Sequence, residues 1–309
     1  APLGPAMRFF HLAASLLSLA AAEAGPQPES CKAAPMQGAS LLQSDTTRKL
    51  SHAPTHSAAV VKPSVPSGML EACSKIYLDM GSNMGVQVRK LFEPEHYPGA
   101  EVLPIFDRFF GLPAERRRPS NESGLCAVGF EASPEWAGRL QRVEKAYKDA
   151  KGWSASFVVP AAVSDRDNET VTFHYGNNWG PYQDVWAGIA TEYKQAPKAT
   201  KVPTLDMAAF VAEQIVPLSS KNVTVVGKVD IEGSEYVILP KLLKEGLLCA
   251  GTIDVLFIEF HETKPAGYEQ YSPEALKAQI AEGGRCAGRP PTRIIDLDDE
   301  SYAADGAPL

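Results

Sequence analysis

Short apolar runs alternate with amphipathic segments from about residue 69 onward. Apolar runs rich in Val, Ile, Leu and Phe that end at polar or turn residues predict buried strands. We expect strands over residues 76–80, 127–131, 156–163, 223–230, 254–260 and 293–297. Helices are expected between most of them. Because strands that alternate with helices form a parallel sheet covered on both faces, the pattern predicts an α/β fold with a doubly wound, mostly parallel sheet.

The expected helices carry recognisable start signals. One is expected to begin at Pro134 with Ser133 as its N-cap, because apolar residues recur on one face after it. Two others are expected over about 235–244 and 273–282, the second capped by Ser272.

The first part of the chain lacks this alternation. Arg8, the apolar run after it and the small residues that follow have the pattern of a secretory signal, so residues 1–24 are interpreted as an upstream extension plus signal peptide. The run is shorter than the ~20 residues that span a bilayer, so no stable membrane span is expected. Residues 25–68, rich in Pro, Ala and Ser, predict a flexible stem, 69–300 the folded domain, and 301–309 a tail. A leader that directs the chain to an organelle is the alternative.

Glycosylation sequons and cysteines bear on the compartment. Asn121, Asn168 and Asn222 each begin an Asn-X-Ser/Thr sequon, which agrees with a glycoprotein of the secretory pathway, either in the endoplasmic reticulum or Golgi lumen or secreted. The five cysteines include no closely spaced C-x-x-C pair, so no metal site is expected. Cys73 and Cys126 each lie at the start of an expected strand, and they would be within bridging reach if those strands are neighbours.

Two connections are longer than such a sheet needs. Residues 93–124 are interpreted either as a functional lid or as a disordered insertion, and their basic run at 116–118 is more typical of a solvated loop than of a partner patch. Residues 176–201, rich in Gly, Asn and Trp, are a candidate substrate cover, with an aromatic mini-core under a loop as the alternative. The short strand expected over 170–175 would form a hairpin at the sheet edge.

The most informative segment is the glycine-spaced turn after the first expected strand. Asp79, Gly81, Asn83 and Gly85 follow the pattern Asp-x-Gly-x-Asn-x-Gly where a strand leads into a helix. This spacing differs from the G-x-G-x-x-G of dinucleotide sites. A carboxylate before the first glycine favours a cationic ligand such as S-adenosylmethionine.

Acidic residues recur where the other expected strands end. Glu131, Asp230 with Glu232, and Glu259 followed by His261 come after successive apolar runs. In an open parallel sheet the carboxyl ends of the strands form the ligand-binding edge. We therefore expect these side chains to share one edge of the sheet with Asp79.

The chain resembles the FkbM family of S-adenosylmethionine-dependent methyltransferases over about residues 76–262. The resemblance rests on the motifs Leu78-Asp-Met-Gly-Ser-Asn-Met-Gly85, Val128-Gly-Phe-Glu-Ala-Ser-Pro134, Ala161-Ala-Val-Ser-Asp165, Val202-Pro-Thr-Leu-Asp206, Lys228-Val-Asp-Ile-Glu-Gly-Ser-Glu235 and Ile258-Glu-Phe-His261. The family commonly has Glu-Pro-Asn-Pro where this chain has Glu131-Ala-Ser-Pro134, a difference that keeps the carboxylate.

This resemblance implies a class I methyltransferase sheet of the Rossmann-like type, a bound S-adenosylmethionine and O-methylation of a hydroxyl on a glycan or another small polar acceptor. Asp79, Gly81, Asn83 and Gly85 would surround the methionine part of the cofactor. Glu131 would accept hydrogen bonds from the ribose hydroxyls.

For the remaining positions, the resemblance would place Ser164 and Asp165 beside the adenine. Asp230 and Glu232 would face the acceptor. His261 is expected to act as general base, because histidine titrates near neutral pH.

The net charge argues against one class of partner, and two other functions compete with the methyltransferase interpretation. A net charge of -7 argues against nucleic acid as a partner. A secreted binding protein that keeps the fold without turnover is the alternative function. An NAD-dependent oxidoreductase is disfavoured because the first glycine turn lacks the dinucleotide spacing.

Overall fold

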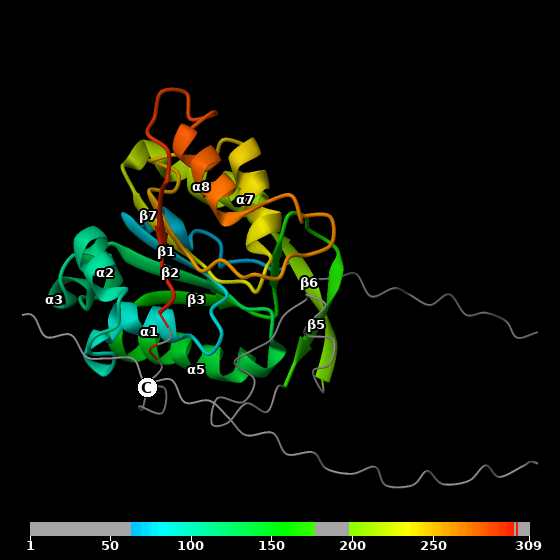
Figure 1. Ribbon diagram of the computed structural model, residues 1–309. Helices are drawn as coiled ribbons and strands as arrows, with labels where there is room; N and C mark the ends of the chain where they lie inside the picture. The colour runs from blue at the N-terminus through cyan, green and yellow to red at the C-terminus, as the bar shows by residue number, and fades with distance from the viewer. Residues whose placement is uncertain (1–62, 177–197, 300, 302–309) are drawn as a thin grey trace, which may run out of the picture. The chain divides into compact units, whose positions relative to one another are not determined.

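The computed structural model describes residues 63–176, 198–299 and 301 (Figure 1). The expected signal peptide, nearly all of the stem, residues 177–197 of the candidate substrate cover and all but the first residue of the tail lie outside this part of the chain. Among the described residues, none of the helices has the length and apolar character that crossing a bilayer requires.

A six-stranded parallel sheet forms the centre of the fold and confirms the predicted α/β class. Its order is β3-β2-β1-β7-β8-β9, and every pair of neighbours is parallel. The bounds are β1 (Lys75–Met80), β2 (Leu125–Phe130), β3 (Ser154–Val158), β7 (Thr224–Val229), β8 (Val255–Ile258) and β9 (Arg293–Asp296). The chain moves outward from β1 to β3 and then crosses to β7 on the other side of β1. The strand order therefore reverses between β1 and β7, which is where ligands bind in open α/β sheets.

Helices cover both faces of this sheet (Figure 1). On one face lie α7 (Glu235–Lys244) and α8 (Pro273–Glu282), and on the other lie α1 (Val86–Phe92) and α5 (Ala137–Ala146). Strand β1 shows why two cores exist. Ile76, Leu78 and Met80 belong to the core under α7 and α8, whereas Tyr77 belongs to the core on the opposite face, because successive strand residues point to opposite faces.

Further short helical segments connect these elements. They are η1 (Met69–Ala72), η3 (Pro134–Trp136), η4 (Tyr147–Lys151), α6 (Met207–Phe210), η6 (Val211–Ile215) and η7 (Val216–Lys221). Ser272 caps α8 as predicted, since its side chain accepts a hydrogen bond from the Ala275 N–H at 3.1 Å. Ser133 occupies the predicted N-cap position before Pro134, but its side chain makes no capping hydrogen bond, and its backbone N–H donates to Glu131.

A second, three-stranded sheet corrects two strand predictions. It has the order β4-β6-β5, formed by β4 (Ala162–Ser164), β5 (Thr170–Tyr175) and β6 (Lys198–Asp206). The strand expected over 156–163 is divided between β3 in the large sheet and β4 in the small one, because Pro160 has no N–H to continue a ladder. The predicted β5 strand exists, but it pairs with β6 in this separate sheet and does not extend the edge of the large sheet.

The long connection at 93–124 is neither a lid nor disordered. It folds into η2 (Pro94–His96), α2 (Leu103–Phe110), α3 (Pro113–Arg116) and α4 (Ser120–Ser123). Phe106 and Phe110 are fully buried against Tyr77, with ring centroids 5.1 and 6.3 Å away. The connection therefore supplies part of the hydrophobic core.

The basic run in this connection is mainly structural. Arg116 is completely buried, donating to the Leu91 carbonyl at 3.0 Å and the Gly111 carbonyl at 2.7 Å and pairing with Asp107. The expectation of a solvated basic loop is therefore wrong for Arg116, because the guanidinium satisfies carbonyls where short helices end.

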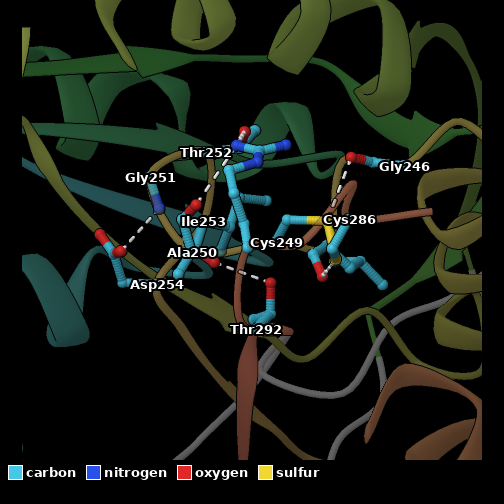
Figure 2. The surroundings of a disulfide bond; sticks show 11 residues. Gly246, Cys249, Ala250, Gly251, Thr252, Ile253, Asp254, Cys286 and Thr292 are labelled. Atoms are coloured by element: carbon cyan, nitrogen blue, oxygen red, sulfur yellow. Dashed lines mark hydrogen bonds between the residues drawn. A yellow bond between two sulfur atoms is a disulfide. The ribbon is translucent and has the colours of Figure 1, made fainter. Parts of the chain in front are cut away.

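Two disulfides tie the loops at the amino-terminal ends of the strands. Cys73 and Cys126 are bridged with Cα atoms 6.0 Å apart, as expected for neighbouring β1 and β2. A second bridge, which the sequence did not predict, joins Cys249 after α7 to Cys286 after α8 (Figure 2). Thr292 donates to the Ile253 carbonyl beside it at 2.7 Å.

The segment after β9 is anchored to the domain rather than solvated. Asp299 is buried and its carboxylate lies 3.1 Å from Lys90 Nζ and accepts the Val102 N–H at 3.0 Å. Asp299 thus holds the end of the folded domain against α1 and the start of α2.

Candidate functional site

The strand register brings the predicted acidic residues to one edge. Met80 pairs with Phe130 on one side and with Val229 on the other, and Val229 pairs with Ile258. The residues that directly follow are Gly81, Glu131, Asp230 and Glu259. The expectation that they share the carboxyl edge of the sheet is confirmed.

The glycine turn after β1 packs against the end of β7. Gly81 has φ +88°, and a Cβ at this position would lie 1.7 Å from the Asp230 carbonyl oxygen. Only glycine fits, both for its backbone conformation and for the close approach. Gly85 also has φ +88° and precedes α1, and Asn83 between them has φ 51°. The turn thus places its backbone directly against the end of β7 at Asp230.

Glu131 links this turn to the end of β2. One carboxylate oxygen accepts the Asn83 N–H at 2.6 Å and the other accepts the Ser133 N–H at 2.5 Å. Burial raises the pKa of Glu131 to about 7, although the two backbone donors act to lower it. Each carboxylate oxygen has a second lone pair, so the group can still accept hydrogen bonds from a diol.

Asp79 is a fully buried carboxylate with spare hydrogen-bonding capacity. Its Oδ2 atom has no hydrogen-bond partner among the described residues, and Tyr77 lies 3.4 Å from its other oxygen. Burial raises the pKa of Asp79 to about 6, and the charge of Lys228 opposes this rise. An unsatisfied buried oxygen at a ligand-binding edge is open to a donor or a cation.

Lys228 was not singled out as a site residue by sequence reasoning. Its Nζ lies 2.5 Å from Asp230 Oδ2, and its side chain is only 6% exposed. Burial acts to lower the pKa of Lys228, but Asp230 and Asp79 outweigh burial and raise it. The sequence could have indicated this contact through the two-residue spacing of Lys228 and Asp230, because residues two apart lie on the same side of a strand.

His261 lies among four carboxylates. Its Nε2 atom is 3.2 Å from Glu232, 3.6 Å from Glu259 and 3.8 Å from Asp230, and its Nδ1 atom is 3.1 Å from Glu235. The predicted catalytic residues Asp230, Glu232 and His261 are therefore brought together, and Glu259 and Glu235 join them.

The titration of this cluster changes the role predicted for His261. Burial acts to lower the His261 pKa, but Glu235, Glu232 and Asp230 outweigh it and raise the pKa to about 10. Burial, together with Asp230, raises the pKa of Glu259 to about 8. At neutral pH the His261 imidazole is protonated in this arrangement. Its assignment as a free general base, which rested on an ordinary histidine pKa, does not fit.

The turn from β7 to α7 positions two of these carboxylates. Glu232 has φ 54°, a conformation that non-glycine residues rarely adopt, and Gly233 follows with φ +95°. Glu235, the first residue of α7, is completely buried, and its Oε1 accepts the Ile231 N–H at 2.8 Å as well as facing His261. Glu235 was not predicted as a site residue, because the sequence pattern does not reveal that an acid at the start of a helix is buried.

Ser164 and Asp165 form a separate group. Asp165 lines an open cavity of about 750 Å³ with Lys241 and Tyr268, and its backbone carbonyl accepts from Lys241 at 2.6 Å. The Ser164 hydroxyl lies 3.4 Å from the Asp165 carboxylate. In the described part of the chain, none of their hydrogen bonds or ion pairs reaches Glu131 or Asp230. The structure thus does not join these two residues to the other predicted cofactor residues.

Comparison with known proteins adds no assignment, since no family model, curated protein or solved structure matches this chain. The FkbM resemblance stays a prediction that rests on the quoted motifs.

Proposed function

We propose that this protein is an S-adenosylmethionine-dependent O-methyltransferase that acts on a hydroxyl of a glycan or another small polar molecule. The observation that carries the proposal is the edge between β1, β2 and β7. There, a glycine turn with φ +88° at Gly81 lies between the buried carboxylates Asp79 and Glu131 and directly against Asp230.

The buried carboxylates suit the two polar parts of the cofactor. Asp79 has an oxygen without a partner at the turn, which fits the cationic ammonium or sulfonium of the methionine part. Glu131 keeps lone pairs for the ribose diol while its backbone donors hold it in place. Gly81, Asn83 and Gly85 let the cofactor approach the backbone closely. Ser164 and Asp165 would lie beside the adenine, as the resemblance to the FkbM family implies.

The acceptor would lie over the carboxylates that follow β7. Bound S-adenosylmethionine would supply an activated methyl group for the acceptor oxygen and would leave as the neutral thioether S-adenosylhomocysteine. The hydroxyl proton must pass to a base, and we assign this role to Glu232 rather than to the protonated His261. Asp230 would align the hydroxyl, since alignment alone supplies up to ~7–11 kcal/mol.

Calorimetry with the full chain tests the cofactor assignment. We expect S-adenosylmethionine and S-adenosylhomocysteine to bind the wild type, NAD not to bind, and Glu131→Ala to lose binding. Asp149→Ala removes an exposed carboxylate on the α5 side and is the matched control, which should bind normally. A folded wild type that binds neither sulfur compound would refute the proposal. Transfer of labelled methyl to glycan acceptors then identifies the acceptor.

A non-catalytic binding protein is the second candidate function. The specific observation in its favour is that His261 is enclosed by four carboxylates and holds its proton at neutral pH. It predicts cofactor binding without methyl transfer to any acceptor, and equal affinities in wild type and Glu232→Gln.

A further inference from the structure

The geometry around His261 points to a divalent-cation site, and we propose that Asp230, Glu259 and His261 bind one ion of the Mn²⁺ type. One ligand atom from each residue lies within 4.8 Å of the other two. The sequence predicts no metal site, because its cysteines form no close pair and these three ligands come from two different strand ends.

The separations among the three proposed ligand atoms match a ligand shell better than mutual hydrogen bonds, and an ion would replace the 3.2 Å contact between His261 Nε2 and Glu232. His261 Nε2 is 3.6 Å from Glu259 and 3.8 Å from Asp230, beyond the ~2.7–3.2 Å of a good hydrogen bond. Ligand atoms that each lie ~2.1 Å from one ion are about 3.0–3.5 Å apart in octahedral or tetrahedral geometry. The three ligand atoms, all within 4.8 Å of one another, would need to draw together to these separations to close around an ion.

A buried carboxylate orients the histidine from behind. Glu235 has a completely buried side chain, and its Oε1 lies 3.1 Å from His261 Nδ1. When an ion binds in place of the Nε2 proton, this contact would hold the remaining proton on Nδ1 and leave the Nε2 lone pair for the ion. Carboxylate–histidine–metal triads have this arrangement.

Independent evidence for a cation site comes from an orphaned carboxylate oxygen in the cluster. Glu235 Oε2 is buried without a hydrogen-bond partner among the described residues. Asp79 pairs in register with Lys228, whose ammonium contacts Asp230. Asp79, Asp230, Glu232, Glu235 and Glu259 thus face Lys228 and His261, and a buried excess of negative charge favours an added cation.

The mixed ligand set selects the class of ion. Carboxylates suit Mg²⁺, Ca²⁺ and Mn²⁺, whereas an imidazole favours transition metals, so two carboxylates and one imidazole fit Mn²⁺ or a similar ion. A hydroxyl bound to such an ion has a lowered pKa. That catalytic use rests on the proposed function, in which Glu232, outside the ligand set, takes the proton, whereas the binding of the ion does not.

Electron paramagnetic resonance tests the site by following free Mn²⁺ as it is added to the full chain without S-adenosylmethionine. We expect one bound Mn²⁺ per chain in the wild type and its loss in Asp230→Asn and His261→Gln. Asp296→Asn removes an exposed carboxylate at the same sheet edge and should bind like the wild type. Glu235→Gln retains an acceptor oxygen and should weaken binding by about 10–100-fold.

The outcomes separate the two proposals. No Mn²⁺ binding by the wild type, or equal binding by wild type, His261→Gln and Glu235→Gln, would overturn the metal site. Thermal unfolding shows whether each variant folds. If Asp230→Asn or His261→Gln does not fold, the Mn²⁺ affinity of Glu235→Gln decides whether the site exists. Mn²⁺ binding without cofactor binding would support the metal site and refute the methyltransferase proposal. Cofactor binding without Mn²⁺ binding would support the methyltransferase proposal and refute the metal site.

Discussion

At the scale of single residues, the site depends on side chains whose properties are set by burial. Asp79 and Glu131 lie at a sheet edge where carboxylates are ordinarily solvated, yet burial raises their pKa values to about 6 and about 7. Groups with strongly shifted pKa values gather at functional sites, because a ligand can repay the cost of burying them.

Cofactor affinity should therefore increase with pH through Glu131. Its folded pKa of about 7 lies above the usual 4.5. Between these pH values, folding of the ligand-free protein takes up a proton, so the free energy of unfolding falls as pH rises. A ribose diol donates hydrogen bonds and favours the ionised form, so binding releases the proton. We expect S-adenosylhomocysteine to bind about tenfold more tightly at pH 8 than at pH 6.

Calorimetry at several pH values measures this change, and Glu131→Gln should remove it. Asp79, whose pKa is also raised, would account for a slope that remains below neutral pH. The same pH dependence in wild type and Glu131→Gln would show that Glu131 does not contact the ligand.

The Gly81 turn gives a second test at this scale. Gly81→Ala should destabilise the protein and abolish cofactor binding, since the new Cβ would meet the Asp230 carbonyl at 1.7 Å. Gly99→Ala has the same φ of +88° with no atom within 4 Å, so it carries only the ~1–2 kcal/mol cost of that conformation.

Urea unfolding and calorimetry compare these two variants. The excess loss of stability in Gly81→Ala is expected to be roughly 1–3 kcal/mol, the usual cost of forcing atoms into a packed place. Equal losses in both variants would mean that the turn is not packed against β7.

At the scale of elements, the connection between α1 and β2 changes from an apparent insertion into a supporting part of the core. Phe106 and Phe110 of α2 pack on Tyr77 of β1, two residues before Asp79. The connection thus supports the strand that leads into the glycine turn, although it contributes no predicted site residue.

Arg116→Ala is expected to destabilise the protein by about 3–5 kcal/mol, because it removes a buried guanidinium and leaves the Leu91 and Gly111 carbonyls and the Asp107 carboxylate without it. Arg118→Ala, at an exposed position of the same basic run, should change stability by less than about 0.5 kcal/mol. Thermal or denaturant unfolding checks both. If Arg116→Ala left the free energy of unfolding nearly unchanged, the basic run would again be interpreted as a surface patch.

At the scale of the described domain, the two disulfides and the candidate functional site lie at opposite ends of the large sheet. The Cys73–Cys126 and Cys249–Cys286 bridges join loops near the amino-terminal ends of β1, β2, β8 and β9. The acidic residues lie at the carboxyl ends. The bridges therefore strengthen the scaffold and leave the ligand-binding edge unconstrained.

Cys249→Ala with Cys286→Ala should lower the free energy of unfolding by roughly 2–4 kcal/mol, since each bridge closes a long loop in the unfolded chain. Cofactor binding by the folded variant should be unchanged because of the distance in the fold between the bridge and the site. Intact mass with and without reductant must first show two bridges. Unchanged stability on removing the cysteines would mean that the second bridge does not form.

The sequence by itself determined the fold class and most strands and helices, because apolar periodicity and turn residues are local signals. It also located Asp79, Glu131, Asp230, Glu232 and His261 at strand ends, which register then brought to one edge. Other features were decided only by the tertiary structure: the division of the predicted strand at Pro160 and the burial of Arg116 and Asp299. Burial and charge at a point in space depend on residues distant in the chain, as His261 shows. Its four carboxylate neighbours come from two strand ends and a helix start, and together they convert an expected base into a protonated group or a metal ligand.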